Sequence, residues 1–394
     1  YEITYGDWSS DVCSSDLINL LPLKQDEDGT IVTQYAMGPV GELGLLKMDF
    51  LGLKTLTVIR NTCEMVRQIR GLTVDIDHLP LDDPKTYDLL NRAETLGIFQ
   101  LESSGMRELC KKFQITSVEH ITALVALYRP GPMDLIPEFI KRRHGEVKVE
   151  YEHSLLEPIA KETYGILIYQ EQVMQAAQLL AGYSLGGADL LRRAMGKKKK
   201  EEMDKQRDSF VKGCKEKNKI PEAKANQIFD LLEKFAGYGF NKSHAAAYAI
   251  VAYQTAYLKA NYTVEFLSAM MTNDMGDTAK LSQYIAEART MGIEVLPPDV
   301  NESQMFFAPA GKEGKAIRFG LVAVKGIGEM VVECLLKGRD EGGPFKSLSE
   351  LCERVDGRTV NRKTLEAFIK SGACDSFGET RATLFASIDM ALTR

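Results

Sequence analysis

What the chain lacks excludes several classes of protein. Its seven cysteines form no C-x-x-C pair and its five histidines no H-x-x-x-H pair, so neither a zinc site nor a disulfide framework is indicated. The longest apolar run, residues 245–253, is too short to cross a bilayer, and the first residues carry no secretory signal. We therefore expect a cytoplasmic protein with reduced cysteines and no membrane partner.

What is present is a globular composition with one basic element on an acidic chain. With 394 residues, 44% of them hydrophobic, the chain is long enough for two or three domains with their own cores. The net charge is −6, but residues 189–219 alone carry +6, so the remainder sums to −12. Such a concentrated basic element suggests a site for a polyanion, either nucleic acid or a triphosphate.

The basic element contains two kinds of sequence. From Glu201 onward, many charges have an opposite partner four residues away, as on a solvated helix face. Arg192, Arg193 and residues 197–200 are instead six cations with no acidic residue among them. An anion site at these six residues and a solvated helix face both remain open.

The first residues differ from the rest of the chain. Residues 1–17 are rich in Ser and Asp, contain the only Trp, and show neither helical nor strand periodicity. The string DWSSDVCSSDL resembles translated sequencing-adapter read-through. We expect an artefactual, disordered tail, with native sequence resuming near Ile18. A genuine flexible N-terminus is the alternative.

A small α+β region is predicted next. From Ile18 the pattern predicts a strand, a turn at DEDG, a strand over residues 30–35, and a mainly apolar strand over residues 43–50. Asp49 near the end of this last strand must be paired, bound to a metal or used as a helix cap, because burial penalises a free carboxylate. The helix that follows begins near Lys54, and its predicted apolar face consists of Leu56, Ile59, Cys63 and Val66.

From Pro84 to Asn273 the chain reads as almost entirely helical. Capping and proline signals predict helix starts at Asp83, Ser103, Ser117, Ser154 and Pro221. Glycines predict helix ends at Gly145, Gly182, Gly196 and Gly237.

Beyond Asn273, the sequence predicts a helix over residues 278–291, a subdomain boundary at EVLPPDVNES, and a hairpin formed by residues 306–308 and 316–320.

Two breaks interrupt the helical region. Residues 128–132, YRPGP, predict a rigid turn with an arginine beside it. Residues 237–244, GYGFNKSH, lead into a helix whose N-terminus, with Lys242 and His244 beside it, favours an anion. In the simpler alternative, Ser243 is the N-cap and His244 merely occupies the first turn. Three tyrosines on this helix could stack on bases, but core packing is favoured: Tyr248, Tyr253 and Tyr257.

A third motif lies in the C-terminal part. Lys325, Gly326, Ile327 and Gly328 join two short helical patterns, as in a helix-hairpin-helix turn. Such a turn presents backbone N–H groups to a DNA phosphate, with Ile327 in the core and Lys325 nearby.

These motifs resemble one family. From Ile18 to the end, the chain resembles the alpha subunit of bacterial DNA polymerase III, the replicative C-family polymerase. The matching strings are KMDFLGLKTLT, GIFQLESSGM, ALVALYRPGPM, YGILIYQEQVMQAAQLLAGYSLGGADLLRRAMGKKK, KFAGYGFNKSHAAAYAIVAYQTAYLKANY and VLPPDVNES. The resemblance implies a mainly α fold, with multi-helical fingers, a small α+β palm remnant at the N-terminus and a helix-hairpin-helix subdomain at the C-terminus. The implied divisions are the tail (1–17), the end of the palm (18–60), the fingers (61–273) and an outer fingers subdomain (274–394).

The resemblance also implies roles for individual residues. Asp49 matches the third of three palm carboxylates that hold the catalytic Mg²⁺ ions. The cations that match the fingers region around the incoming nucleotide are Arg192, Arg193, Lys197, Lys198 and, on a neighbouring element, Lys242 with His244. Lys325, Gly326 and Gly328 match a turn that follows the duplex backbone without reading its sequence.

In this family the first two palm carboxylates precede the position of Ile18, and the clamp-binding peptide follows that of Arg394. One magnesium ligand of three cannot assemble a two-metal site, so we expect the chain by itself not to polymerise. The parent protein would be a DNA-directed DNA polymerase, a nucleotidyltransferase that extends a primer 3′-end. Its implied partners are primer–template DNA, deoxynucleoside triphosphates and, through regions outside this chain, the sliding clamp and other replisome subunits. The alternative is a non-catalytic DNA-binding module, with salt-dependent affinity for DNA and no turnover.

Overall fold

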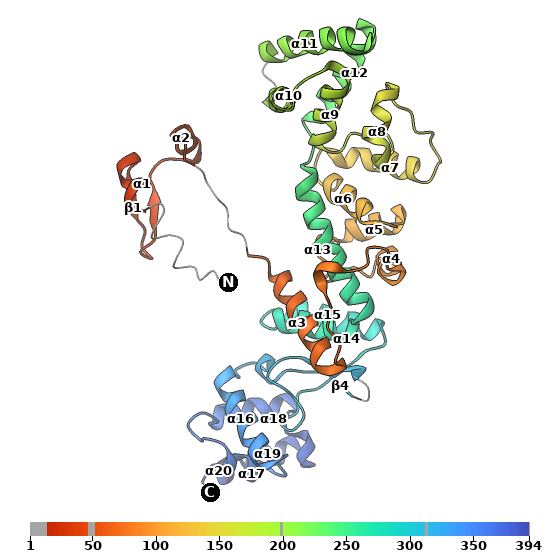
Figure 1. The fold of residues 1–394 in the computed structure, drawn as a ribbon. Coiled ribbons are helices and arrows are strands. Elements are labelled where there is room, and N and C mark those ends of the chain that lie inside the picture. The colour runs from red at the N-terminus through yellow and green to blue at the C-terminus, as the bar shows by residue number, and fades with distance from the viewer. Residues whose placement is uncertain (1–13, 46–51, 198–199, 312–313, 394) are drawn as a thin grey trace. The chain divides into compact units, whose positions relative to one another are not determined.

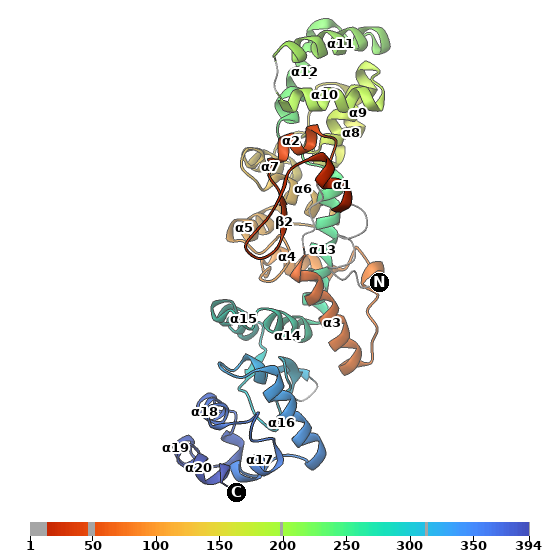
Figure 2. The ribbon, with the colours of Figure 1, turned by 90° about the vertical axis from the view of Figure 1, so that its left-hand side faces the viewer.

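The computed structural model describes residues 14–45, 52–197, 200–311 and 314–393 (Figures 1 and 2). It divides into two compact units, Tyr1–Leu53 and Lys54–Arg394. The boundary expected at residue 60 falls inside helix α3 (Lys54–Arg70). The other expected domain boundaries remain predictions.

The first unit contains a small hairpin between two short helices. Its elements are α1 (Ser14–Leu20), β1 (Leu23–Gln25), β2 (Ile31–Thr33) and α2 (Met37–Glu42). The strands are antiparallel, with Leu23 opposite Thr33, and the DEDG turn between them contains Gly29 in the left-handed region at φ 87°. The predicted hairpin is therefore confirmed, but the strand expected from Ile18 begins only at Leu23, because residues 18–20 belong to α1.

Two differences from the sequence-based expectation lie in this unit. Helix α1 begins at Ser14, inside the segment expected to be disordered. The strand predicted over residues 43–50 is wrong at its start, because the N–H of Leu43 continues the hydrogen bonding of α2 to Pro39. Residues 46–51, which include Asp49, lie outside the described part of the chain.

The second unit is mainly helical (Figure 1). After α3, its helices up to residue 273 are α4 (Pro84–Asn91), α5 (Ser104–Phe113), α6 (Val118–Leu127), α7 (Ile136–Arg143), α8 (Glu157–Ala160), α9 (Gln170–Ala181), α10 (Leu185–Lys197), α11 (Lys200–Asn218), α12 (Glu222–Ala236), α13 (Lys242–Asn261) and α14 (Thr263–Asn273). Short 3₁₀ turns are η1 (Ile76–His78), η2 (Pro132–Leu135), η3 (Ser154–Leu156) and η4 (Lys161–Thr163). The mainly α fold class is confirmed.

Helix α13 organises the largest core. It packs mainly against α6 and α4. A stripe of fully buried alanines, spaced three or four residues apart, allows this close approach: Ala245, Ala249, Ala252 and Ala256. Tyr253 is also fully buried, and its hydroxyl donates to the Pro80 carbonyl oxygen at 2.5 Å, so core packing is confirmed for this tyrosine.

Most of the predicted helix starts are confirmed by hydrogen bonds at their N-caps. The side chains of Asp83, Ser103 and Ser117 each accept a hydrogen bond from a backbone N–H group in the first turn of the helix that follows, α4, α5 and α6 respectively. Ser154 begins only the 3₁₀ turn η3. The end predicted at Gly196 is confirmed to within one residue, because the last residue of α10 is Lys197.

Helix α3 packs on α14, and this contact decides which of its faces is buried. Ile59 and Val66 are buried as predicted, but Leu56 is 52% exposed. Arg70 at the end of α3 donates to the buried Glu265 of α14 at 2.5 and 2.9 Å. The tertiary contact therefore rotates the buried face away from Leu56.

The C-terminal part of this unit is shared between two cores, one formed with α3 and α14 and the other its own. It contains α15 (Thr278–Thr290), β3 (Glu294–Leu296), β4 (Ala308–Ala310), β5 (Ala316–Arg318), η6 (Leu321–Ala323), α16 (Glu329–Gly342), α17 (Leu348–Arg354), α18 (Arg362–Ser371), η7 (Asp375–Phe377), α19 (Arg381–Ala386) and α20 (Ile388–Leu392). Strands β4 and β5 form the predicted hairpin, and β3 adds to β5 in parallel. Sequence reasoning missed β3, because the prolines that follow it dominate the local pattern. Helices α16–α20 gather in one group in Figure 2.

No helix in the described ranges combines the length and apolar character needed to span a bilayer.

Candidate functional site

Two sequence-predicted elements, α10 and the start of α13, meet at the N-terminus of α9. Gln170, the first residue of α9, donates its backbone N–H to Phe240 at 2.9 Å and its side-chain amide to Gly239 at 3.1 Å. Its amide oxygen accepts from Arg192 of α10 at 3.3 Å. A Cβ on Gly239 would lie 3.1 Å from the Gln170 side chain, so the glycine permits this close approach. One glutamine therefore links the two cationic elements.

Both arginines of α10 share one carboxylate. Arg192 and Arg193 each approach Asp189 to 2.8 Å, three and four residues earlier on the same helix. Hydrogen bonds from Arg192, more than the charge of either arginine, lower the pKa of Asp189 below its ordinary value. The arginines are thus paired, although no acidic residue lies between them and the lysines that follow.

Lys242 at the start of α13 is also paired. Its ammonium lies 2.6 Å from Glu162 and 5.4 Å from the centre of the Tyr169 ring. Its backbone N–H donates to Glu171 of α9 at 2.9 Å. The N-terminus of α13 therefore already holds a carboxylate, as its dipole favours.

His244 lies in a series of aromatic rings. Its ring centre is 5.5 Å from Phe240 and 4.3 Å from Tyr248, and Tyr248 lies 5.1 Å from Phe99. The N-cap of α13 is Asn241, whose side chain accepts from the His244 N–H at 2.7 Å. The alternative in which Ser243 is the N-cap is therefore wrong.

The two predicted breaks meet in space. The Arg129 guanidinium lies 4.7 Å from the centre of the Phe240 ring and donates to the Tyr238 carbonyl oxygen. Gly131 adopts φ 98°, and an added Cβ would lie 2.7 Å from the Tyr238 ring. The YRPGP turn therefore supports the loop that carries Phe240 and leads into α13.

We call this group the cation cluster. It contains four cations and three carboxylates: Arg129, Arg192, Arg193, Lys242, Glu162, Glu171 and Asp189. Its chemistry suits a ligand with several negative charges, because such a ligand can replace the carboxylates as partner of more than one cation.

The KGIG turn has a different construction. Gly326 adopts φ 89°, and a Cβ added there would meet no atom of the described residues within 4 Å, so the turn is open on that side. Ile327 is buried in the C-terminal core, and Lys325 is exposed. Gly328 is the N-cap of α16 and offers no side-chain cap to the first N–H groups. The element before the turn is the short 3₁₀ helix η6, so the first of the two predicted helical patterns is present as one 3₁₀ turn and not as an α-helix.

The structure does not describe the side chains of three predicted site residues. Asp49 and Lys198 lie outside the described residues, and Lys197 is described only as the last residue of α10. Within the described ranges, no three metal-ligating side chains converge.

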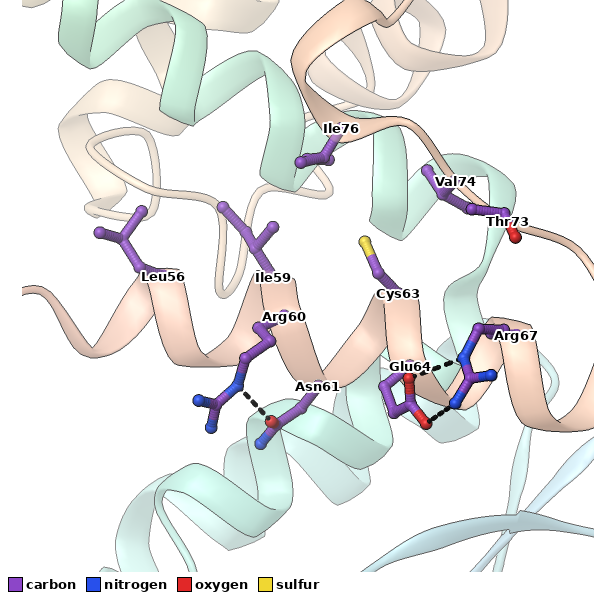
Figure 3. Close-up of a pocket in the computed structure, with 10 residues that line it drawn as sticks. All are labelled: Leu56, Ile59, Arg60, Asn61, Cys63, Glu64, Arg67, Thr73, Val74 and Ile76. Atoms are coloured by element: carbon purple, nitrogen blue, oxygen red, sulfur yellow. Dashed lines mark hydrogen bonds and ion pairs between the residues drawn. The ribbon is translucent and has the colours of Figure 1, made fainter. Parts of the chain in front are cut away.

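A groove of about 660 Å³ follows α3 (Figure 3). Its apolar lining includes Leu56, Ile59 and Ile76, and at its rim Arg67 donates to Glu64 at 2.6 and 2.9 Å. None of the sequence-predicted site residues lines it.

Sequence reasoning missed several partners of the predicted cations. Asp189 could have been found, because it precedes both arginines at helical spacing. Gln170, Glu171 and Glu162 gave no such signal, because only the tertiary fold brings them to α10 and α13.

Comparison with known families gives three matches. Residues 55–218 match the bacterial DNA polymerase III alpha subunit finger domain. Residues 11–52 match the bacterial DNA polymerase III alpha NTPase domain, and residues 292–384 match a helix-hairpin-helix motif. The cations of α10 and the KGIG turn lie inside the first and the last of these matches.

Curated relatives are similar over nearly the whole chain. The DNA polymerase III subunit alpha of Thermus aquaticus is 52% identical over 383 residues, which are 96% of this chain and 31% of the relative. The corresponding proteins of Deinococcus radiodurans and Bacillus subtilis are 49% and 48% identical over 96% and 95% of this chain, and 29% and 33% of their own lengths. The chain therefore spans about a third of the length of the curated relatives it matches.

Proposed function

Because the chain belongs to the bacterial DNA polymerase III alpha subunit family, we propose that it is part of a DNA-directed DNA polymerase that adds deoxynucleotides to a primer 3′-end. Within this reaction its 394 residues supply contacts to the incoming nucleotide and to duplex DNA. The observation that carries the proposal is the joining of α10 and the start of α13 by Gln170, which brings together three cations, Arg192, Arg193 and Lys242.

We assign the cation cluster to the triphosphate of the incoming nucleotide. Among the described residues, Arg192 and Arg193 share a single partner carboxylate, Asp189, and both present a planar guanidinium suited to phosphate oxygens. Lys242 adds a third cation, at the N-terminus of α13. His244, which is exposed between Phe240 and Tyr248, lies close enough to contact the nucleoside.

We assign the KGIG turn to the duplex backbone. Uncapped N–H groups at the start of α16 and the exposed Lys325 suit a phosphate, and neither reads a base. Contacts of this kind give sequence-independent affinity that weakens as salt rises.

Asp49 is proposed as one ligand of the catalytic Mg²⁺, which would supply charge neutralisation at the triphosphate when bound. This role rests on the match of KMDFLGL to the family. The sliding clamp and other replisome subunits are proposed partners of regions outside this chain.

The test measures three properties of the purified 394-residue chain. We expect it to bind dTTP with Mg²⁺, to bind primer–template DNA in a salt-dependent way, and not to extend the primer. Absence of both binding activities would refute the proposal. Primer extension that survives Asp49→Asn would show that the metal assignment is wrong.

A further inference from the structure

One fully buried cation is not part of the cation cluster. Lys259, near the C-terminal end of α13, has no exposed side-chain surface. Its ammonium donates to the carbonyl oxygens of Glu94 and Leu96 at 2.8 and 2.9 Å, and to the carboxylate of Glu287 on α15 at 2.6 Å. An ammonium has three protons to donate, so every one has an acceptor. Burial lowers the pKa of Lys259, and the charge of Glu287 opposes this shift.

Two of these acceptors belong to an irregular loop, residues 94–101. The loop contains Gly97 at φ 77° and Gln100 at φ 64°, both in the left-handed region. Glycine adopts this conformation without strain, but Gln100 keeps it only where surrounding contacts hold its backbone. Beyond the bonds from Lys259, the Phe99 N–H donates to the Thr255 hydroxyl of α13 at 3.2 Å. Two side chains of α13 therefore fix the backbone of this loop.

The loop in turn reaches the cation cluster through aromatic rings. Phe99 packs on Tyr248, Tyr248 on His244, and His244 on Phe240, with centre-to-centre distances of 5.1, 4.3 and 5.5 Å. The Arg129 guanidinium covers the far side of this series, 4.7 Å from the Phe240 ring centre. A displacement of Phe99 would remove the ring against which Tyr248 rests.

We propose that Lys259 is a positioning residue for the nucleotide site: its ammonium, together with the Thr255 hydroxyl, fixes residues 94–101 so that Phe99 holds the rings of Tyr248 and His244 in place. This inference rests on the proposed function of the cation cluster. Lys259 itself touches neither the cluster nor the proposed ligand.

An ion pair in which only the carboxylate is buried provides a control, because the Arg70 side chain is 40% exposed. Arg70 donates to the buried Glu265 across the contact of α3 with α14, and its guanidinium lies 5.3 Å from the Tyr262 ring centre. None of the described bonds of Arg70 reaches residues 94–101. Arg70→Met therefore also takes a cation from a buried carboxylate but leaves the loop in place.

The experiment compares Lys259→Met with Arg70→Met in the full 394-residue chain. The readouts are hydrogen–deuterium exchange of residues 94–101 and the Kd for dTTP with Mg²⁺. We expect Lys259→Met to speed exchange in this loop and to raise the Kd about tenfold. Arg70→Met should lower thermal stability without either change. If Lys259→Met prevents folding, Thr255→Val tests the same loop through its other anchor, with the same two changes at smaller size.

The positioning role would be overturned if hydrogen–deuterium exchange of residues 94–101 were unchanged in Lys259→Met. It would also be overturned if the Kd for dTTP rose equally in Lys259→Met and Arg70→Met. A Thr255→Val variant that folds and shows neither change would overturn it as well. If the unsubstituted chain itself fails to bind dTTP, the assignment of the cation cluster to the triphosphate fails and the positioning role falls with it, whereas the exchange data still show whether Lys259 holds the loop. The two failures are therefore distinguishable.

Discussion

The cation cluster and the KGIG turn offer positive charge to an anion in opposite ways. In the cluster, Arg192, Arg193 and Lys242 are already bound to carboxylates of the same chain. At the KGIG turn, Lys325 is exposed and the first N–H groups of α16 have no side-chain cap. The cations of the cluster must leave their carboxylates before they can bind an anion. At the KGIG turn, the first N–H groups of α16 have no side-chain cap to displace.

This difference suits two kinds of ligand. A triphosphate carries enough charge to replace several carboxylates at once, so a paired cluster discriminates against weaker anions. A duplex backbone offers one phosphate at a time, and many open contacts together give affinity without selecting a sequence. Cations that are paired before binding therefore favour selective binding, and unpaired donors favour sequence-independent binding.

The largest expected effect comes from removing both arginines of the cluster. Arg192→Gln with Arg193→Gln should raise the Kd for dTTP with Mg²⁺ about a hundredfold, because two charge-assisted hydrogen-bonding groups are lost. Lys212→Gln with Lys215→Gln on α11 is the control, since it removes the same charge from the same basic element. Equal effects of the two double variants, measured by equilibrium binding, would mean that the element is only a solvated face.

An intermediate effect is expected from Asp189→Asn. This change removes the carboxylate that pairs both arginines, so affinity for inorganic triphosphate should increase about fivefold. Asp230→Asn is the matched control, because Asp230 pairs with Arg207 outside the cluster at 2.6 Å. Competition against labelled dTTP measures the change. Weaker binding by Asp189→Asn would show that Asp189 orients the arginines rather than competing for them.

The smallest effect is expected at the KGIG turn. Lys325→Gln should weaken primer–template binding only about threefold and reduce the slope of log Kd against log salt by about 1. Its Kd for dTTP should stay unchanged. Lys337→Gln lies further along α16, where Lys337 is exposed and 4.0 Å from Glu341, and should leave the slope unaltered. Fluorescence anisotropy at several salt concentrations measures the slope. If the slope for Lys325→Gln equals that of the unsubstituted chain, the KGIG turn does not contact the DNA.

Local signals predicted much of the fold. The caps at Asp83, Ser103 and Ser117 and the hairpin of β4 with β5 follow from interactions within a few residues, which the sequence displays directly. The buried face of α3 and the parallel strand β3 depend on α14 and β5, which are distant in the sequence. Periodicity alone could not identify those partners.

The same division holds for the candidate site. The sequence by itself determined that cations concentrate in α10 and at the start of α13, and that Gly326 and Gly328 flank Ile327, because charge and glycine positions are properties of the chain. Only the tertiary structure decided that Glu162 pairs with Lys242, that Glu171 accepts from the N-terminus of α13, and that Gln170 joins α10 to the loop before α13. It alone placed Lys259 beneath residues 94–101. Hydrogen bonds and ion pairs act over a few ångströms, so residues far apart in the sequence become partners only after the helices have packed.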